Sequence, residues 1–280
     1  MLQYFKKRLE KSQLKKTFKE YGFEVKNFQI ENFGSIDYAR WLHPSDSPKS
    51  IDASKIKFYQ KLSKKGGMII DIGAHEGDTT VPMALAAGKD GLVLGLEPNM
   101  YVYKVLEKNA SLNTDKTNII PLCFAATEKD GDFTFNYSDA SFCNGGFLSK
   151  IKKKRHGHNY TLNVTGKNLQ DYLFKNHQDD LQRLDLIKID AEGYDKEILK
   201  SLPTILEQFK PNLMIECYKR LNLEERNELY DIVDGYGYQL YLLDDFEEFN
   251  TLVKIDKSNM TDQKHFEMLA IHKSKEFNVQ

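Results

Sequence analysis

The sequence predicts a doubly wound α/β fold, in which a mostly parallel sheet is covered by helices on both faces. The first observation is that short apolar runs alternate with stretches of helical periodicity from residue 68 onward. The second is that these runs are apolar at consecutive positions, which is typical of strands buried on both faces. The third is that helical stretches separate the runs, as crossover connections between parallel strands require.

The predicted elements follow one another in the order that such a domain needs. They are MIIDI (68–72) before a helix at 79–87, LVLGLE (92–97) before a helix at 101–109, NIIPLCFA (118–125), LDLIKID (184–190) before a helix at 196–202, and PNLMIEC (211–217) before a helix at 223–235. The end of the chain differs, because YQLYLL (238–243) and FEMLAIH (266–272) have no obvious helix between them. We expect these last two strands to pair antiparallel.

Residues 1–60 form a polar region that we expect to be an N-terminal helical and loop cap on the main domain, residues 61–280. Apolar residues with helical spacing are found at its start, and WLHPSDSPKS (41–50) contains two prolines typical of a loop. The first 19 residues are strongly basic. A solvated helix face is the simpler interpretation, and contact with an acidic glycan or a membrane surface is left open.

The overall composition limits the functional class. The 280 residues are 40% hydrophobic, enough for one large core, and the net charge of -1 disfavours a nucleic-acid partner. Three cysteines, Cys123, Cys143 and Cys217, fit neither a disulfide framework nor a metal knuckle, so a reducing cytoplasm is the expected location. The sequence shows neither a secretory signal nor an apolar run of roughly 18 residues, so we expect a soluble protein without a membrane span.

The first strand-to-helix turn, in IDIGAHEGDTT (70–80), is where such a sheet binds its ligand. A dinucleotide-binding fold would use GxGxxG to bring backbone amides against a pyrophosphate, but His75 and Asp78 stand where glycines would be needed. Asp71 and Glu76 flank the turn, and their carboxylates would repel a diphosphate but attract an ammonium group. The turn therefore predicts a ligand that carries an amine and no phosphate.

Glu97 ends the second predicted strand, in GLEPN (95–99). An acid at this position of a doubly wound sheet can accept hydrogen bonds from both hydroxyls of a ribose. A ligand with a ribose, an amine and no phosphate is S-adenosylmethionine.

Four blocks of the sequence resemble the FkbM-type methyltransferases, a branch of the class I S-adenosylmethionine-dependent enzymes. The blocks are IDIGAHEGDTT (70–80), GLEPN (95–99), LNTDKTNIIPLCFAAT (112–127) and LIKIDAEGYDKEIL (186–199). The resemblance covers about residues 66–217 with the blocks in the right order and spacing. It implies a class I methyltransferase Rossmann-like sheet of seven strands whose last strand is antiparallel.

The resemblance also implies which residues hold the cofactor. The loop after the first strand would line the methionine side, Glu97 would take the ribose, and residues 124–127 would lie near the adenine. The implied cofactor-binding set is Asp71, Gly73, Ala74, His75, Gly77, Glu97, Pro98 and Ala126. His75 departs from the commoner asparagine, which makes its protonation a variable.

Asp190 and Glu192 are the predicted catalytic residues. Methyl transfer from a sulfonium is an in-line displacement, in which alignment supplies most of the rate. A hydroxyl is a poor nucleophile until its proton starts to leave, so a base within hydrogen-bond reach is needed. Asp190 ends LIKID at the sheet edge where Asp71 and Glu97 are expected, which favours it as the base, with Glu192 second; a purely structural role in the turn is the alternative.

The acceptor is expected between this sheet edge and two loops, WLHPSD (41–46) and SFCNGGF (141–147), although the second could be a plain hairpin connection. The predicted acceptor contacts are Trp41, His43, Phe142, Asn144 and Phe147. The basic run KIKKKRHGH (150–158) is a solvated loop by default, with contact to an anionic acceptor left open. Its histidines lack neighbouring cysteine or carboxylate ligands, so no metal site is predicted.

These observations together predict an S-adenosylmethionine-dependent methyltransferase that acts on a hydroxyl. The resemblance implies a sugar, a glycan or a secondary metabolite as the acceptor. An NAD-dependent sugar oxidoreductase is an alternative, opposed by the missing third glycine of the loop. A noncatalytic cofactor-binding module is a second alternative, opposed by the intact KIDAEG block (188–193).

Overall fold

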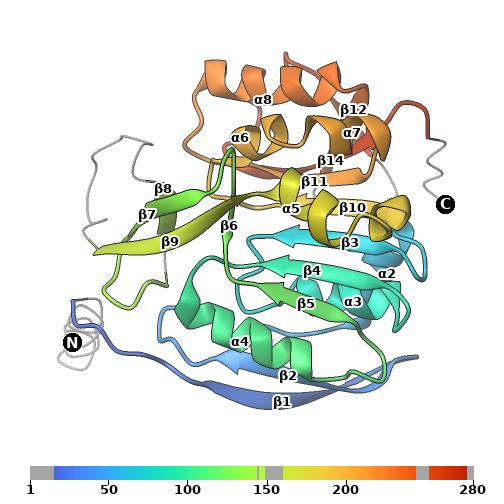
Figure 1. Ribbon diagram of the computed structural model, residues 1–280. Coiled ribbons are helices and arrows are strands. Elements are labelled where there is room, and N and C mark those ends of the chain that lie inside the picture. The colour runs from blue at the N-terminus through green and yellow to red at the C-terminus, as the bar shows by residue number, and fades with distance from the viewer. Residues whose placement is uncertain (1–15, 144, 149–159, 244–251, 276–280) are drawn as a thin grey trace.

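An eight-stranded sheet with helices on both faces forms the centre of the molecule, in a computed structural model that describes residues 16–143, 145–148, 160–243 and 252–275 (Figure 1). The strand order is β13-β12-β14-β11-β10-β3-β4-β5. The strands are β3 (Met68–Ile72), β4 (Leu92–Leu96), β5 (Ile119–Leu122), β10 (Leu184–Ile189), β11 (Asn212–Cys217), β12 (Tyr238–Leu243), β13 (Val253–Ile255) and β14 (Phe266–His272). The predicted α/β class is confirmed.

The central sheet is parallel from β11 through β10, β3 and β4 to β5. β14 is antiparallel to both β11 and β12, with Tyr238 opposite His272, which confirms the antiparallel pairing expected at the end of the chain. The implied count of seven strands was too low. The short strand β13, from a segment in which no strand was expected, adds an antiparallel edge to β12.

The helices divide between the two faces of this sheet. They are α2 (Ala53–Leu62), α3 (Thr80–Ala87), α4 (Met100–Ser111), α5 (Leu169–Asn176), the 3-10 helix η1 (Asp180–Arg183), α6 (Asp195–Lys200), α7 (Pro203–Gln208) and α8 (Leu223–Gly235). Met68, Ile70 and Ile72 of β3 pack with the core under α5 to α8, whereas Ile69 packs with the core under α2 and α3. This two-sided burial explains why the strand is apolar at consecutive positions. Within the described ranges, none of the helices combines the length and the apolarity needed to cross a bilayer.

The described part of residues 1–60 is mainly a β-hairpin, where a helical and loop cap was expected. β1 (Phe23–Ile30) and β2 (Gly34–Trp41) pair antiparallel, and β2 packs beside α4 (Figure 1). The side chain of Asn109 accepts from the N–H of Ala39 at 2.7 Å and donates to its carbonyl oxygen at 2.8 Å, as a neighbouring strand would. Asn113 makes the same pair of bonds with Asp37, so two asparagines fasten the hairpin to the core.

The division at residue 60 falls inside α2, whose buried residues include Phe58 and Leu62 on either side of it. The residues with helical spacing lie outside the described part of the chain, except Phe18. A helix at the start of the chain therefore stays a prediction.

A second sheet of four strands, ordered β6-β9-β7-β8, lies beyond the arrowheads of β3 and β4 (Figure 1). Its strands are β6 (Ala125–Thr127), β7 (Gly131–Tyr137), β8 (Gly145–Leu148) and β9 (Tyr160–Asn168). The strand expected at 118–125 is divided, because β5 ends at Leu122 and β6 joins the second sheet. The second sheet therefore covers one side of the carboxyl edge of the central sheet.

Candidate functional site

The loop between β3 and α3 is fitted against the ends of β4 and β10. The N–H groups of Gly73 and Ala74 both donate to the carbonyl oxygen of Leu96, at 3.0 and 2.9 Å. Gly73 has a φ of +81°, and a Cβ there would lie 2.1 Å from the carbonyl oxygen of Asp190. Only glycine permits this approach, so Gly73 brings the loop into contact with the end of β10.

Asp71 is fully enclosed in the protein. One of its oxygens accepts hydrogen bonds from the hydroxyls of Thr79 and Thr80, at 2.7 and 2.6 Å, and the other lies 3.5 Å from Nζ of Lys188. These two hydroxyl contacts hold the first turn of α3 in place. The exposed fraction of Asp71 is 0%, and the residue does not line the cavity described below. Ala74 and Gly77 are also buried and also do not line it.

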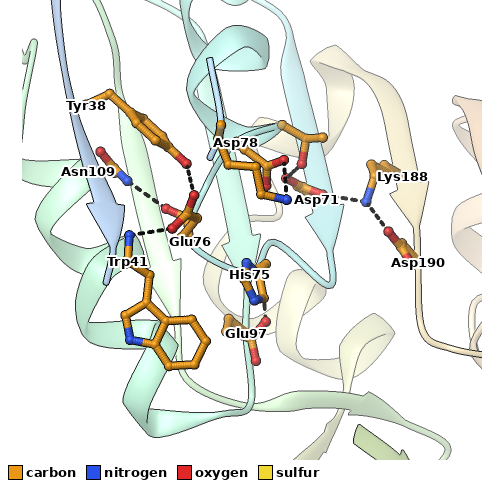
Figure 2. Close-up of polar contacts among 12 residues, drawn as sticks. Tyr38, Trp41, Asp71, His75, Glu76, Asp78, Glu97, Asn109, Lys188 and Asp190 are labelled. Atoms are coloured by element: carbon orange, nitrogen blue, oxygen red, sulfur yellow. Dashed lines mark hydrogen bonds and ion pairs between the residues drawn. The ribbon is translucent and has the colours of Figure 1, made fainter. Parts of the chain in front are cut away.

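Lys188 is a charged residue that the sequence-based prediction did not include. Its Nζ lies 3.2 Å from Oδ2 of Asp190 as well as near Asp71, and the side chain is buried (Figure 2). Burial alone would lower the pKa of Lys188, but the carboxylates of Asp190, Asp71 and Glu267 raise it well above its usual value. The signal in the sequence was a lysine inside the apolar run LIKID, since a buried lysine requires an anionic partner.

Glu97 lies at the carboxyl end of β4 and is held by two backbone donors. The N–H of His75 donates to its Oε2 at 3.0 Å, and the N–H of Asn99 donates to its Oε1 at 2.8 Å. Burial raises the pKa of Glu97 to about 7, and the charges of Asp190 and Asp71 add to this rise. Burial lowers the pKa of His75, which favours a neutral imidazole at the cavity wall.

The turn after β10 places Glu192 at the same edge. Glu192 has a φ of +51°, and the carboxylate of Asp195 fixes the turn by accepting from the N–H groups of Ala191 and Gly193 at 3.4 and 3.0 Å. Burial raises the pKa of Glu192, and the nearby charge of Asp190 raises it further. Two carboxyl groups, one ion-paired and one with a raised pKa, therefore lie close together.

A cavity of about 810 Å³ lies at the carboxyl ends of β3, β4 and β10. It brings together these predicted site residues: Gly73, His75, Glu97, Pro98, Ala126, Asp190 and Glu192. Its other walls come from the segment after β2, from α2, from the second sheet and from the loop after β11; they include Ser45, Asp46, Lys49, Lys55, Tyr59, Tyr137, Lys188, Tyr218, Lys219 and Arg220. The cavity thus combines charged, hydroxyl-bearing and aromatic side chains.

Glu76 faces away from this cavity, so the interpretation that it attracts an ammonium group was wrong. Its Oε1 accepts from the hydroxyl of Tyr38 at 2.8 Å, and its Oε2 accepts from the N–H of Trp41 at 2.5 Å (Figure 2). Its carbonyl oxygen accepts from the side-chain amide of Asn109 at 2.6 Å. Burial raises the pKa of Glu76 to about 7. Glu76 therefore ties the ligand loop to the hairpin and to α4.

Trp41 and His43, two of the predicted acceptor contacts, do not line the cavity. Trp41 is 1% exposed, packs with Val102 and donates from its indole N–H to the carbonyl oxygen of Tyr21 at 3.2 Å. His43 is also buried, with its Nε2 3.4 Å from the carboxylate of Asp139. Both side chains therefore pack between the hairpin and the core, where an acceptor in the cavity cannot reach them.

Phe142 is likewise a packing residue. Its ring stacks on that of Tyr101, with 5.4 Å between the centroids and 8° between the planes. Phe147 belongs to β8, opposite Asn136 of β7. Asn144 lies outside the described residues. Residues 138–143, which follow β7, therefore pack against α4 through Phe142, while Ser138 and Cys143 of the same segment line the cavity.

A metal site does not emerge from the described ranges. They contain no group of three or more histidine, cysteine, aspartate or glutamate side chains arranged to hold a metal ion. His156 and His158 lie outside these ranges.

The donor set of the cavity fits S-adenosylmethionine. Each carboxylate oxygen of Glu97 accepts one backbone N–H and can accept a ribose hydroxyl as well, since such an oxygen has two lone-pair sites. Phe124 and Ala126 offer an apolar surface for a base, and the carboxylate of Asp46 suits the ammonium group of the ligand. A diphosphate would find no free amides in this loop at Gly73, Ala74 and His75, because their N–H groups already donate to Leu96 and Glu97.

Among the comparisons with known proteins, the match to a family model agrees with this chemistry. The family model described as "Methyltransferase FkbM domain" matches residues 71–240. A search of curated proteins gives no match. Among solved structures the chain is similar to methyltransferase FkbM from Methylobacillus flagellatus, with 14% identity, 78% of this chain and 50% of that chain covered, and a TM-score of 0.43.

Two further structures show similar values. A SAM-dependent O-methyltransferase from Thermotoga maritima has 12% identity, with 90% of this chain and 87% of that chain covered and a TM-score of 0.43. Precorrin-6y C5,15-methyltransferase from Geobacter metallireducens has 12% identity, with 78% and 87% covered and a TM-score of 0.41. At these low identities and TM-scores the structures do not support any statement about function, so the family assignment rests on the family model alone. Because that match spans more than half of the chain, the protein belongs to the FkbM family of methyltransferases, and its cofactor is S-adenosylmethionine.

Proposed function

We propose that the protein transfers the methyl group of S-adenosylmethionine to a hydroxyl oxygen of a sugar, a glycan or a secondary metabolite. The observation that carries this proposal is the position of Asp190. It follows β10 at the carboxyl edge of the sheet, lines the cavity, and keeps 43% of its side chain exposed. A carboxylate in this place can accept the proton of a hydroxyl that enters the cavity.

The cofactor-binding residues in this proposal are those that line the cavity. Glu97 accepts hydrogen bonds from the ribose hydroxyls, and Pro98 and Ala126 lie on the adenine side. Gly73 and His75 lie along the methionyl part, on the loop that Gly73 presses against β10. Asp71, Ala74 and Gly77 act indirectly, by holding that loop and the start of α3.

S-adenosylmethionine supplies an electrophilic methyl group on a positively charged sulfur atom. The work of the protein is then to align the acceptor oxygen and to take its proton. A carboxylate held against the sulfonium would stabilise the charged ground state more than the charge-dispersed transition state. We therefore assign Asp190 to the acceptor hydroxyl and not to the sulfur.

Lys188 holds the carboxylate of Asp190 in position for this role. Its ammonium group lies 3.2 Å from Oδ2 of Asp190, and we assign the acceptor proton to the other oxygen, Oδ1. Glu192 is the second candidate base, because it lines the same cavity and its pKa is raised by burial. Once ionised, a carboxylate with a raised pKa is the stronger base.

The cavity wall supports a polyhydroxyl acceptor. Tyr59, Tyr137 and Tyr218 line it, together with serines and charged side chains. The three tyrosines are 1 to 4% exposed, so they offer hydroxyl groups and ring edges to the cavity and no open ring faces. Together with the neighbouring polar groups they provide hydrogen bonds in several directions, which suits a ligand with many hydroxyls.

Incubation with S-adenosylmethionine that carries a trideuterated methyl group, together with small-metabolite and glycan pools, tests the proposal. We expect an acceptor that gains one labelled methyl group as an ether, which survives mild alkaline hydrolysis where a methyl ester does not. The Asp190→Asn variant is the control for enzyme-dependent transfer. A label found on nitrogen or carbon contradicts hydroxyl methylation, and binding of the cofactor without transfer to any pool favours the noncatalytic module.

A further inference from the structure

The segment between β2 and α2 forms one wall of the cavity. Ser45, Asp46 and Lys49 line it, beside Asp78 and Thr79 at the start of α3. Ser45, Asp46 and Lys49 precede the part of the chain that matches the family model, residues 71–240. Family membership alone therefore assigns them no role.

The fold fixes this segment over the ligand loop. It begins directly after Trp41, whose N–H is held by Glu76. The buried ring of His43 then accepts from the N–H of Ser45 at 3.1 Å, and the N–H of Asp46 donates to the carbonyl oxygen of His43 at 3.0 Å. The turn that presents Asp46 is thus anchored on the buried histidine.

Two opposite charges of this segment face the same space. Nζ of Lys49 lies 3.4 Å from Oδ2 of Asp78. Oδ2 of Asp46 is shielded from solvent, and it accepts no hydrogen bond from the described residues. The charged and titratable groups around Asp46 include His75, Lys49, Asp78, Arg40, Glu76, Tyr38 and Cys143. A buried carboxylate oxygen without a donor costs free energy, so a ligand that supplies a donor would stabilise it.

The cofactor has one end with the complementary charges. Its methionyl part carries an α-carboxylate and an α-ammonium group on the same carbon. With the ribose at Glu97 and the adenine near Ala126, this end would follow residues 73–79, which line the cavity beside the segment 45–49. Lys188, another cation of the cavity, contacts two carboxylates, Asp71 and Asp190, whereas Lys49 contacts one, Asp78. Lys49 also lies on the segment beside the start of α3, so we assign the carboxylate of the ligand to Lys49.

We propose that Lys49 and Asp46 form a clamp for the amino-acid end of S-adenosylmethionine, with Lys49 on the α-carboxylate and Asp46 on the α-ammonium group. The proposal rests on the proposed function only through the cofactor and the placement of the ribose at Glu97. It is independent of which acceptor is methylated. The clamp gives the N-terminal region a direct part in cofactor selection.

The test compares two ligands that differ only at this end. S-adenosylhomocysteine carries the amino-acid group, and 5′-methylthioadenosine has the same adenosine and sulfur without it. Calorimetry on the wild-type protein and on Asp46→Asn and Lys49→Met should show that each variant binds S-adenosylhomocysteine about tenfold more weakly or worse, the usual cost of losing a hydrogen bond to a charged group. The affinity for 5′-methylthioadenosine should change less than about threefold, because that ligand never meets the clamp.

Two further variants sharpen the result. Lys49→Arg keeps the charge and should retain most of the affinity for S-adenosylhomocysteine. Lys57→Met removes an equal charge from an exposed position of α2 outside the cavity and should leave both affinities unchanged. Equal weakening of both ligands in Asp46→Asn and Lys49→Met would show a merely structural role and overturn the clamp alone. A wild-type protein that binds neither ligand would overturn the clamp and the proposed function together.

Discussion

The carboxylate of Glu76 lies 2.8 Å from the hydroxyl of Tyr38, a contact that joins the ligand loop to the N-terminal hairpin. Both side chains are buried, and the N–H of Trp41 donates to the second carboxylate oxygen. These two hydrogen bonds hold the loop that carries His75 on the side opposite to the cavity. A buried carboxyl group in this position makes the stability of the protein depend on pH.

Glu76 should make the protein less stable as the pH rises from about 4.5 to about 7. Its pKa is about 7 in the folded protein, because burial disfavours the charged form, against 4.5 as the ordinary value. Within that window the folded protein keeps a proton that the unfolded chain has lost, so the free energy of unfolding falls as the pH rises, by up to about 3 kcal/mol for this group. Above pH 7 this contribution should level off.

Urea unfolding of the wild-type protein and of Glu76→Gln at pH 5 and pH 8 checks this prediction. The amide can still accept from the N–H of Trp41 and donate to the oxygen of Tyr38, but it does not titrate. The variant should therefore lose less stability between the two pH values than the wild-type protein does. Equal losses in both proteins would show that Glu76 is not the group responsible.

Asp190→Asn should leave cofactor affinity within about threefold and lower turnover by roughly a hundredfold or more, because it keeps the shape and removes the base. Calorimetry with S-adenosylhomocysteine and single-turnover methyl transfer measure the two quantities separately. Glu192→Gln is the matched comparison and should reduce turnover less. Normal turnover at saturating cofactor, combined with weak binding, would make Asp190 a binding residue and move the search for the base to Glu192.

Glu97→Gln should weaken binding of S-adenosylhomocysteine by about tenfold to a hundredfold, because a charge-assisted acceptor for the ribose hydroxyls is lost. A 2′-deoxyribose analogue of the ligand gives the matched comparison. Wild-type protein should discriminate against the analogue, and the variant should discriminate less. Undiminished discrimination in Glu97→Gln would mean that the ribose lies elsewhere.

Asp71→Asn should mainly destabilise the protein, by about 3 kcal/mol, because it removes one partner of a buried ion pair and leaves Lys188 less compensated. The double variant with Lys188→Met should be less destabilised than the sum of the two single variants. Chemical unfolding measures all three. A variant with unchanged stability but lost cofactor affinity would instead place Asp71 in contact with the ligand.

The strands of the sheet could be predicted because a strand buried on both faces is apolar at consecutive positions of the sequence. MIIDI and LIKID are such runs, and the carboxyl ends of their strands meet where the fold class requires. Glu97 and Asp190 could be located for the same reason. Each directly follows a predicted strand, and parallel strands end at one edge.

The hairpin and the direction of Glu76 could not be predicted in this way. β1 is mostly exposed on both faces, so FEVKNFQI carries little apolar periodicity. Its partner strand is buried by contacts with α4 and with the core under α2 and α3, both distant in the sequence. Glu76 follows His75, whose φ of +49° turns the chain so that neighbouring side chains point to opposite sides. Nothing in the local sequence specifies that the buried side contains Tyr38 and Trp41.

The asparagine bonds between β2 and α4 affect where a shortened form of the protein can begin. A truncation at residue 60 would cut α2 and delete the hairpin, which would leave the side chains of Asn109 and Asn113 without the backbone groups that they bind and Glu76 without Tyr38. The deletion would also expose the apolar core residues against which Ile36, Tyr38 and Trp41 pack, and such exposed apolar surface favours aggregation or unfolding over a smaller stable fragment. The smallest fragment that keeps the site intact therefore starts before residue 23, upstream of every residue that matches the family model.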